Sequence, residues 1–188
     1  MKRTTRWNIK WIDSVDSTNN EAKRHIESLS SFSVIAAHEQ TVGRGQRGNY
    51  WMSEPYKNLT FSVVVKYRDA RFFNVGIDKQ SVISDIVSTT LIELLSNYGI
   101  SAHIKLPNDI YVRDKKICGI LIEHSVFGNN LVFSIIGVGL NVNQKEFDLR
   151  LPNPTSIVLE NGSKEIDLHC ILERLLEILY GKFEFNLK

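Results

Sequence analysis

The chain has 188 residues, 43% of them hydrophobic and 23% charged, a composition typical of one globular domain with a buried core. The formal net charge of +2 gives no reason to expect nucleic acid or an acidic membrane as a partner. The two cysteines, Cys118 and Cys170, form no paired motif, which argues against a disulfide framework or a zinc site and favours a reducing compartment. Because no apolar segment follows the basic N-terminus, we expect neither a signal peptide nor a membrane span, and we expect a cytoplasmic protein.

The first third of the chain is expected to contain three strands and one helix. Alternation of apolar and polar residues predicts strands at Trp7–Trp11 and at 59–66, and a short apolar run predicts another at Val34–Ala37. The segment Thr18–Glu21 resembles a capping box, so we expect a helix that begins there and runs to about Leu29.

The rest of the chain is expected to contain a long helix, several paired strands and a final helix. Apolar residues recur at helical spacing over 82–95, and Gly99 follows as a stop signal. The segment 131–141 is long and mostly apolar, so we expect it to be central in the sheet. The expected strands are 102–105, 110–112, 117–126 and 131–141, with a hairpin turn at 128–130 and a last helix at 168–183.

Hairpin-linked strands with interspersed helices predict an α+β fold. We expect a single mixed, mainly antiparallel sheet with helices packed against it. No internal repeat, low-complexity tract or linker composition divides the chain. We therefore expect residues 1–188 to form one domain.

Three glycines and two arginines share one short loop, Gly43–Gly48. Glycines allow the backbone to bend sharply and to approach a ligand closely. Arg44 and Arg47 add planar, always-charged donors that suit phosphate or carboxylate oxygens. The pattern predicts a loop that binds an anion.

Two further segments carry polar and charged residues at strand ends. Asn108 and Asp109 follow one expected strand, and Lys116 enters another. If these strands are neighbours, their ends bring two guanidinium groups, an ammonium, a carboxylate and an amide to one pocket. Such a set suits phosphoryl or nucleotidyl chemistry, in which positioning and charge stabilisation do most of the catalysis. Asp109 is suited to hold Mg²⁺, which prefers carboxylate and phosphate oxygens.

Each of these motifs also has a purely structural interpretation. The glycine–arginine loop is compatible with a mobile surface turn or a nonspecific nucleic-acid contact, Lys115–Lys116 with a solvated hairpin turn, and Pro107–Asp109 with a simple turn. Asp16–Asn19 alone favours a helix cap. The five histidines show no metal-ligand spacing, so we interpret them as structural. Each structural interpretation is plausible alone, but without a shared pocket all of them would have to be correct at once. We therefore favour a shared pocket.

Five ordered motifs resemble the catalytic domain of bacterial biotin protein ligases, the biotin–[acetyl-CoA-carboxylase] ligases. The motifs are Asp16–Asn19; Gln40 with Gly43–Gly48 and Trp51; Lys105–Asp109; Lys116–Glu123; and Gly137–Asn143. The resemblance implies the fold shared with lipoyl ligases and related to class II aminoacyl-tRNA synthetase domains. It also implies a two-step reaction that uses ATP and Mg²⁺. Biotin and ATP form biotinyl-5′-AMP, and the biotinyl group then passes to a lysine of a biotin carboxyl carrier domain.

The resemblance also implies roles for individual residues. Arg44 is expected to grip the phosphates, Lys116 to bridge the biotin carboxylate and the α-phosphate, and Asp109 to hold Mg²⁺ or to meet the acceptor lysine. Trp51 is expected to stack on adenine and Asn141 to bind the adenine edge. The implied biotin-binding residues are Ser17, Thr18, Asn19, Gln40, Gly45, Gln46, Lys116 and Gly119, and the implied nucleotide-binding residues are Arg44, Arg47, Trp51, Asn108, Lys116 and Asn141.

The chain departs from the family pattern at several places. Leu106 stands where tryptophan is usual, Gln46 replaces a common arginine, and Cys118 takes a position that is usually smaller. No winged-helix segment precedes Trp7, and the chain ends at Lys188, before the small β-barrel domain of most members. We therefore expect no DNA binding and no such C-terminal domain. The identity of the carboxylase and a homodimer through an exposed sheet edge stay open.

Three other functions are compatible with parts of the pattern. A lipoate or octanoate ligase of the same fold would resemble an Arg-Arg-x-x-Gly-Gly-Gly loop, which is missing here. A non-catalytic module would only hold an adenylate or a carrier domain, but the retention of Lys116, Arg44 and Asp109 argues against it. An RNA-contacting protein is disfavoured by the modest net charge and by the lack of an aromatic and basic stripe.

Overall fold

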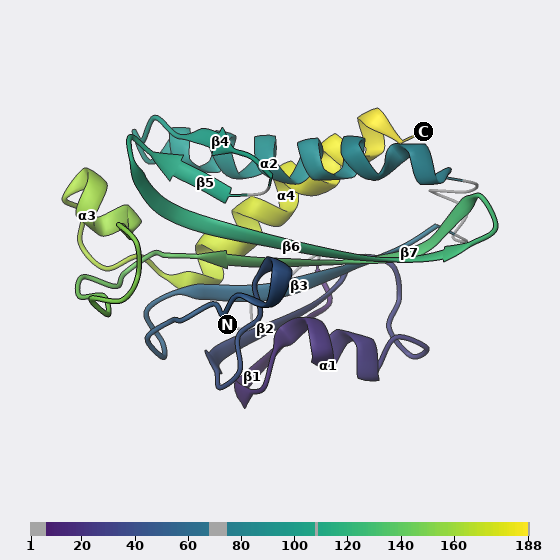
Figure 1. Cartoon of the computed structure of the whole chain (residues 1–188), viewed down its shortest axis with the longest axis horizontal. Coiled ribbons are helices and arrows are strands. Elements are labelled where there is room, and N and C mark those ends of the chain that lie inside the picture. Colours follow the sequence, from purple (N-terminus) through teal and green to yellow (C-terminus); the bar gives the residue numbers. More distant parts are fainter. Residues whose placement is uncertain (1–6, 68–74, 108, 188) are drawn as a thin grey trace, which may run out of the picture.

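One seven-stranded sheet forms the centre of the molecule (Figure 1). The computed structural model describes residues 7–67, 75–107 and 109–187. Across the sheet the strands run in the order β1-β2-β3-β7-β6-β5-β4, so β1 and β4 form its two edges. The strands are β1 Ile9–Val15, β2 Ser33–Gln40, β3 Leu59–Lys66, β4 His103–Lys105, β5 Asp109–Val112, β6 Lys115–Phe127 and β7 Asn130–Leu140.

The sheet is mixed but mainly antiparallel. β1 and β2 are parallel, and each other neighbouring pair among the described strands is antiparallel. β6 and β7 form a long hairpin whose turn contains Gly128 with a φ of 59°. β7 is the fourth of the seven strands. The predicted sheet type and the central place of the strand expected at 131–141 are therefore confirmed.

Helices cover both faces of this sheet (Figure 1). α2 (Gln80–Asn97) and α4 (Leu168–Asn186) pack against each other on one face. The short α1 (Thr18–Arg24) lies on the other face, against β2, β3 and β7. α3 (Ile157–Asn161) follows the loop after β7. Within the described ranges, no helix has the length and apolar character needed to cross a membrane.

Alternation along the central strands sends side chains into two separate cores. On β3, Phe61 and Val63 belong to the larger core, which α2 and α4 also line. Val64 follows Val63 on the strand, so its side chain points to the opposite face, where it packs with Ala22 of α1 in a smaller core. Because α1 is short, it covers only part of its face of the sheet, and the uncovered part is available for a binding site.

The start of α1 differs from the predicted capping box. The N-cap is Ser17, its side chain makes no capping hydrogen bond, and Thr18 is the first helical residue. The Thr18 hydroxyl donates to Gln40 Oε1 at 3.2 Å, and Glu21 pairs with Arg24 at 2.7 Å. The predicted capping box is therefore wrong, because both of its side chains are engaged by other partners.

The remaining elements lie close to their predicted ranges. β3 has the expected bounds, and Gly99 follows α2 with a φ of 73°, as expected for a stop. α1 ends at Arg24 rather than near Leu29. Ile26 and Leu29 nevertheless pack against the smaller core. The apolar residues of that segment are therefore partly buried, as the pattern predicts, but the segment forms successive turns rather than a longer helix.

Candidate functional site: a polar cavity with a cation at each end

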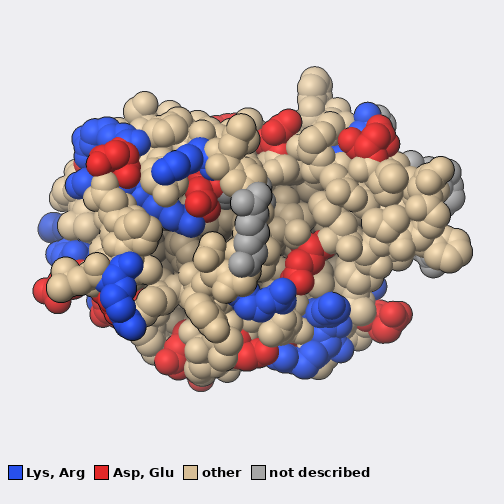
Figure 2. Space-filling model, viewed as in Figure 1, with Lys and Arg blue, Asp and Glu red and all other residues tan. Residues whose placement is uncertain are grey.

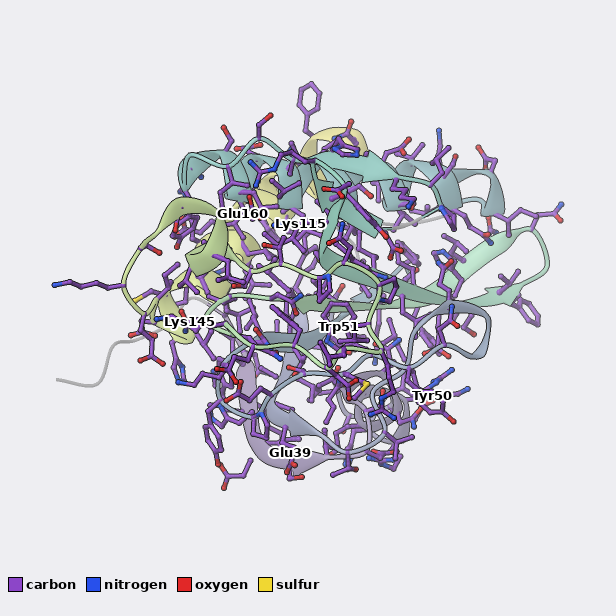
Figure 3. The ribbon with its side chains drawn as sticks, turned by 60° about the vertical axis from the view of Figure 1, so that its left-hand side comes forward. Glu39, Tyr50, Trp51, Lys115, Lys145 and Glu160 are labelled. Atoms are coloured by element: carbon purple, nitrogen blue, oxygen red, sulfur yellow. The ribbon has the colours of Figure 1, made fainter. Side chains whose placement is uncertain are left out.

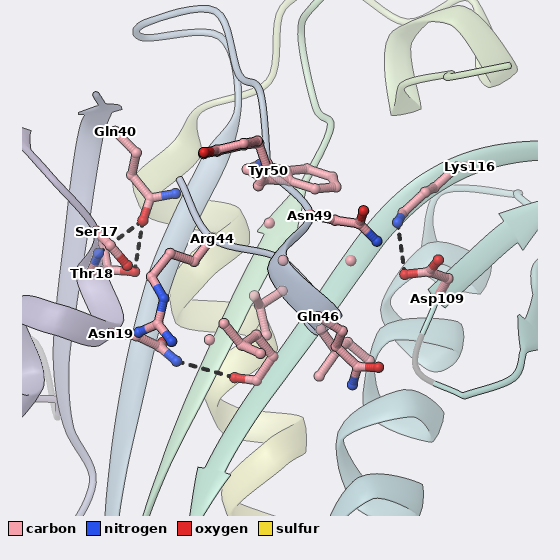
Figure 4. A pocket seen from close by; sticks show the side chains of 18 of the residues that line it. Ser17, Thr18, Asn19, Gln40, Arg44, Gln46, Asn49, Tyr50, Asp109 and Lys116 are labelled. Carbon is pink, nitrogen blue, oxygen red and sulfur yellow. Dashed lines mark hydrogen bonds and ion pairs between the residues drawn. The ribbon is translucent and has the colours of Figure 1, made fainter. Parts of the chain in front are cut away.

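A cavity of about 190 Å³ lies between α1, the glycine–arginine loop and the strands β5, β6 and β7 (Figure 4). Figure 2 shows a molecular face that is hollowed near its middle and carries basic and acidic residues in small mixed groups. The three segments expected to converge do meet in the cavity. The predicted site residues that line it are Ser17, Thr18, Asn19, Gln40, Arg44, Gly45, Gln46, Trp51, Asp109, Lys116 and Gly119.

Glycines on β6 and β7 make room for Trp51 at the cavity wall. A methyl group added to Gly139 would lie 2.3 Å from Trp51 Cε2, and one added to Gly119 would lie 3.0 Å from its Cζ3. Trp51 therefore lies against the two strands, whereas the neighbouring Tyr50 is 75% exposed (Figure 3). The indole Nε1 of Trp51 is buried without a hydrogen-bond partner. The ring thus shapes the cavity and leaves one unpaired donor there.

Asn19 is fixed in one orientation by its neighbours. Its Oδ1 accepts a hydrogen bond from Ser62 Oγ at 2.6 Å. Its Nδ2 donates to the Leu121 carbonyl at 3.3 Å and to Glu123 Oε2 at 2.8 Å. A methyl group at Gly137 would lie 2.3 Å from Asn19 Oδ1, so glycine is needed for this close approach. The amide is therefore oriented before any ligand arrives.

Gln40 and Thr18 form a second oriented polar pair (Figure 4). The Thr18 N–H donates to Gln40 Oε1 at 2.8 Å. The Ser62 hydroxyl oxygen, buried under α1, lies 2.7 Å from Thr18 Oγ1. Ser17 and Asn19 beside them are also buried. This end of the cavity is thus lined by amide and hydroxyl groups, which suit a ligand with several hydrogen-bonding atoms of its own.

The glycine–arginine loop crosses the cavity as a narrow hairpin. The Gly45 N–H donates to the Asn49 carbonyl at 2.7 Å, and the Trp51 N–H donates to the Gly43 carbonyl at 2.9 Å. Gln46–Gly48 forms one short turn of 3-10 helix, η1. A methyl group at Gly43 would clash with the Trp51 carbonyl. At Gly43 the close approach is therefore to the chain itself, rather than to a ligand as the sequence suggested.

Arg44 lies at the α1 end of the cavity (Figure 4). Its Nη2 lies 3.1 Å from Glu123 Oε1, and its Nη1 donates to Asn20 Oδ1 at 2.8 Å. The Arg44 side chain is 40% exposed and the Glu123 side chain 29%. Side chains from α1 and β6 therefore hold this loop cation.

Lys116 lies at the other end of the cavity (Figure 4). Its Nζ lies 2.8 Å from Asp109 Oδ1 and 5.8 Å from the centre of the Trp51 ring. Both partners of this ion pair are less than half exposed. The cavity thus carries a cation at each end, and a carboxylate accompanies the ammonium.

The backbone of Lys116 is held by a segment that follows β7. Its N–H donates to the Asn153 carbonyl, and its carbonyl accepts from the Thr155 N–H, each at 2.9 Å. These bonds form a parallel bridge between Lys116 and Pro154. The Asn153 side chain also donates to the Asp114 carboxylate at 2.7 Å. β7 ends at Leu140, opposite Cys118 of β6. The segment 153–155 therefore pairs with β6 at Lys116 in place of β7.

Asn141 is not among the residues that line the cavity. Its Nδ2 donates to the Thr155 carbonyl at 2.8 Å, and its backbone N–H donates to the Ile117 carbonyl at 3.0 Å. Its Oδ1 is buried without a partner. Asn141 therefore joins the returning segment to β6, and its expected contact with an adenine edge stays a prediction.

Two predicted nucleotide-binding groups cannot be placed. Asn108 and the side chain of Arg47 lie outside the described residues.

Cys118, next to the site, is fully buried, and this burial raises the pKa of its thiol well above the usual range. The thiol therefore stays protonated and is not a candidate nucleophile.

Sequence reasoning gave no role to several residues of the site. Asn49, Tyr50 and Pro107 line the cavity. Glu123 was only the last residue of a matched motif, yet it contacts both Arg44 and Asn19. The alternation of β6 carries the available signal, because Glu123 lies two residues beyond Leu121 and therefore on the same face of the strand.

The sequence model of the biotin/lipoate A/B protein ligase family matches residues 11–141. The chain belongs to this family. It is 27% identical over 171 residues to the bifunctional ligase/repressor BirA of Escherichia coli (strain K12), an alignment that covers 90% of this chain and 51% of the relative. It is 29% identical over 127 residues to the biotin--[acetyl-CoA-carboxylase] ligase of Paracoccus denitrificans, covering 68% and 51%. The chain spans about half the length of these relatives.

The fold is that of solved biotin protein ligases. The structure of the biotin protein ligase from Aquifex aeolicus in complex with biotin and ATP superposes with a TM-score of 0.78 at 28% identity, covering 95% of this chain and 72% of that one. The biotin protein ligase from Leishmania major in complex with biotinyl-5-AMP gives a TM-score of 0.68 at 25% identity, covering 92% and 73%. The predicted family and fold are both confirmed.

Proposed function

We propose that this chain is a biotin protein ligase, which activates biotin with ATP and transfers it to a lysine of a biotin carboxyl carrier domain. The observation that carries the proposal is the cavity itself, which has oriented amides and hydroxyls beside Arg44 and the Lys116 ammonium at its other end. The similarity to ligases solved with biotin and ATP or with biotinyl-5-AMP supports the same substrates.

In the first step, a carboxylate oxygen of biotin attacks the α-phosphorus of MgATP, and pyrophosphate leaves. Both reactants are anionic, so their approach is opposed by charge repulsion. Lys116 would bridge the carboxylate and the α-phosphate, and Arg44 would neutralise further phosphate charge. A preorganised cation in a partly buried site stabilises the charge that develops in the transition state, and it costs little reorganisation at the moment of reaction.

Magnesium would enter as part of the nucleotide. Mg²⁺ is commonly held by one or two carboxylates together with substrate phosphates. Asp109 supplies the one carboxylate among the described lining residues, which fits such a site. It is also the carboxylate nearest to Lys116, at 2.8 Å. We therefore assign Asp109 as the residue that would hold the metal, which in turn would neutralise charge on the phosphates.

In the second step, the amine of the acceptor lysine attacks the acyl carbon of biotinyl-5′-AMP. AMP leaves, the amine loses a proton, and an amide bond to biotin forms. We propose that the acceptor belongs to a biotin-dependent carboxylase and that the reaction takes place in the cytoplasm. Cys118 is a free thiol, which is compatible with a reducing compartment. A homodimer through an edge strand stays a prediction.

One end of the cavity, lined by Thr18, Asn19 and Gln40, forms a polar wall. This polar wall favours biotin over lipoate or octanoate, the substrates of the alternative ligase. Thr18, Asn19 and Gln40 present hydrogen-bonding groups to the cavity. An alkyl chain or a dithiolane ring cannot form hydrogen bonds with this wall, and a buried donor or acceptor that loses its partner costs about 1–3 kcal/mol. A ureido ring offers both donors and acceptors to the same groups.

The proposal is tested by incubating the purified chain with biotin, MgATP and a biotin carboxyl carrier domain. Mass spectrometry should show the mass increase of one biotinyl group on the carrier, and none when biotin or ATP is omitted. A carrier that binds but gains no mass would instead favour the non-catalytic module. A mass increase with lipoate or octanoate, but not with biotin, would favour the alternative ligase.

A further inference from the structure

Glu123 connects two parts of the site without lining the cavity. It lies on β6 and carries one carboxylate oxygen toward each of two neighbours. Its Oε1 lies 3.1 Å from Arg44 Nη2, and its Oε2 accepts from Asn19 Nδ2 at 2.8 Å. Arg44 belongs to the glycine–arginine loop, whereas Asn19 belongs to α1. One carboxylate therefore joins the loop to the polar wall of the cavity.

The carboxylate, together with the Leu121 carbonyl, decides how the Asn19 amide is turned. An ionised carboxylate only accepts hydrogen bonds, so the NH₂ group of Asn19 must face Glu123 and its carbonyl must face Ser62. The same carboxylate accepts from Arg44 through both oxygens, since Arg44 Nη1 lies 3.4 Å from Oε2. A change at either partner therefore alters the hydrogen bonding of the other.

Asn20 holds the same guanidinium from α1. Its Oδ1 accepts from Arg44 Nη1 at 2.8 Å, and its Nδ2 donates to Asp16 Oδ2 at 2.8 Å. Asp16 is paired with Arg24 at 2.7 Å. Two described side chains therefore hold Arg44, and one of them, Glu123, also accepts a hydrogen bond from the side chain of Asn19.

We propose that Glu123 is a positioning residue that couples binding at the polar wall to closure of the loop 43–49. It accepts the shorter of the two hydrogen bonds from the Asn19 NH₂ group and holds Arg44, so a ligand that engages Asn19 stabilises the arrangement in which Glu123 keeps the loop over the cavity. The identity of that ligand, biotin, rests on the proposed function. The link between Glu123, Asn19 and Arg44 does not, because it depends on contacts within the chain alone.

The substitution Glu123→Gln separates the two contacts with little change in shape. Glutamine has one acceptor and one NH₂ group, so it can accept from Arg44 or from Asn19 but turns a donor toward the other. Amide hydrogen exchange in the segment 43–49, followed by mass spectrometry, should become about three- to tenfold faster. The control Glu177→Gln breaks an arginine pair with Arg174 on α4 and should leave exchange in this loop unchanged.

A double-substitution cycle identifies the partner. If Glu123 acts through Arg44, Glu123→Gln combined with Arg44→Gln should exchange no faster in the loop than the faster single variant. A rate increase in the double variant equal to the product of the two single increases, or unchanged exchange in Glu123→Gln, would overturn the proposal. If Glu123→Gln does not fold, Glu123→Asp keeps the charge but is too short to reach both partners. It should give the same pattern at smaller size.

The coupling itself is measured by adding biotin alone. In the native chain, biotin should slow hydrogen exchange in the loop, and in Glu123→Gln it should bind about three- to tenfold more weakly and give no such protection even at saturation. Equal protection of the loop in both proteins would contradict the coupling. If the native chain does not bind biotin, the proposed function fails, whereas the exchange cycle without ligand still decides the link to Arg44.

Discussion

The two ends of the cavity hold their cations in different ways. Lys116 lies on a strand whose backbone is hydrogen-bonded to Asn153 and Thr155, and its ammonium is paired with Asp109. Arg44 lies on a hairpin loop, and its guanidinium is held by side chains. We expect the residue on the strand to keep its place when substrate arrives, and the guanidinium on the loop to exchange its side-chain partners more readily. On this view the sheet supplies the fixed charge, and we expect the response to ligand to be confined to the loop.

Removal of the sheet-built cation should have the largest effect. Lys116→Ala removes the charge that we place between the two anionic reactants. We expect adenylate formation to slow by about 10²–10³-fold, the typical cost of losing one preorganised transition-state donor. Pyrophosphate release in a single turnover measures this rate. Lys115→Ala, which removes the adjacent lysine, is the matched control and should retain the native rate. A native rate in Lys116→Ala would remove this residue from its proposed role.

The glycine between the two ends gives the next largest effect. Gly139→Ala places a methyl group 2.3 Å from Trp51 Cε2, so the indole must move into the cavity. We expect biotin binding, measured by calorimetry, to weaken by at least about tenfold. Gly181→Ala in α4 is the matched control, because nothing lies within 4 Å of its added methyl group. It should leave binding unchanged and stabilise the helix by about 0.5–1 kcal/mol.

Removal of the loop cation should cost less than removal of Lys116. Arg44→Ala leaves the backbone of the hairpin intact but removes a partly exposed guanidinium. We expect the KM for ATP to rise by about tenfold while the melting temperature stays near its native value. A loss as large as that of Lys116→Ala would show that both cations are fixed catalytic charges and would break the distinction between the two ends.

The anchor of Lys116 can be tested through Asn153. This residue has a φ of 51°, a left-handed conformation that costs other non-glycine residues about 1–2 kcal/mol. Asn153→Ala should therefore lower the free energy of unfolding by about that amount. Asn153→Gly keeps the backbone conformation and removes only the bonds to Asp114. The glycine variant should be the more active of the two if backbone placement of Lys116 is what matters.

The smallest effect on stability is expected at His124 on β6, which lies outside both ends of the cavity. Its ring lies 2.7 Å from Ser134 Oγ, and burial lowers its pKa below the ordinary value of 6.5. The unfolded chain therefore takes up this proton at a higher pH than the folded chain does. The stabilisation is complete above pH 6.5 and is lost as the pH falls toward the native pKa. Urea unfolding of His124→Gln should show a flatter dependence on pH in that range, with adenylate formation unchanged.

Local patterns were sufficient for most of the fold and for the convergence of the site. The alternation of β3 and the spacing of α2 follow from their own residues, and the order of the strands carries Arg44 and Lys116 to one cavity. The capping box failed because Thr18 and Glu21 have tertiary partners that no local pattern contains.

Roles that depend on distant contacts were not predictable. Glu123 meets Asn19 across 104 positions of sequence, and Asn141 meets Thr155 in a loop without regular structure. The first contact depends on how α1 packs across β6, and the second on the path of the chain after β7. Both are properties of the packed molecule rather than of any single motif.

We propose that cations from separate segments bring biotin and ATP together in one cavity. Biotin-dependent exchange of labelled pyrophosphate into ATP tests it most directly. We expect exchange that requires both biotin and Mg²⁺ and that is nearly abolished in Lys116→Ala. Exchange supported by lipoate or octanoate but not by biotin, or no exchange by the folded chain with any of these acids, would contradict it.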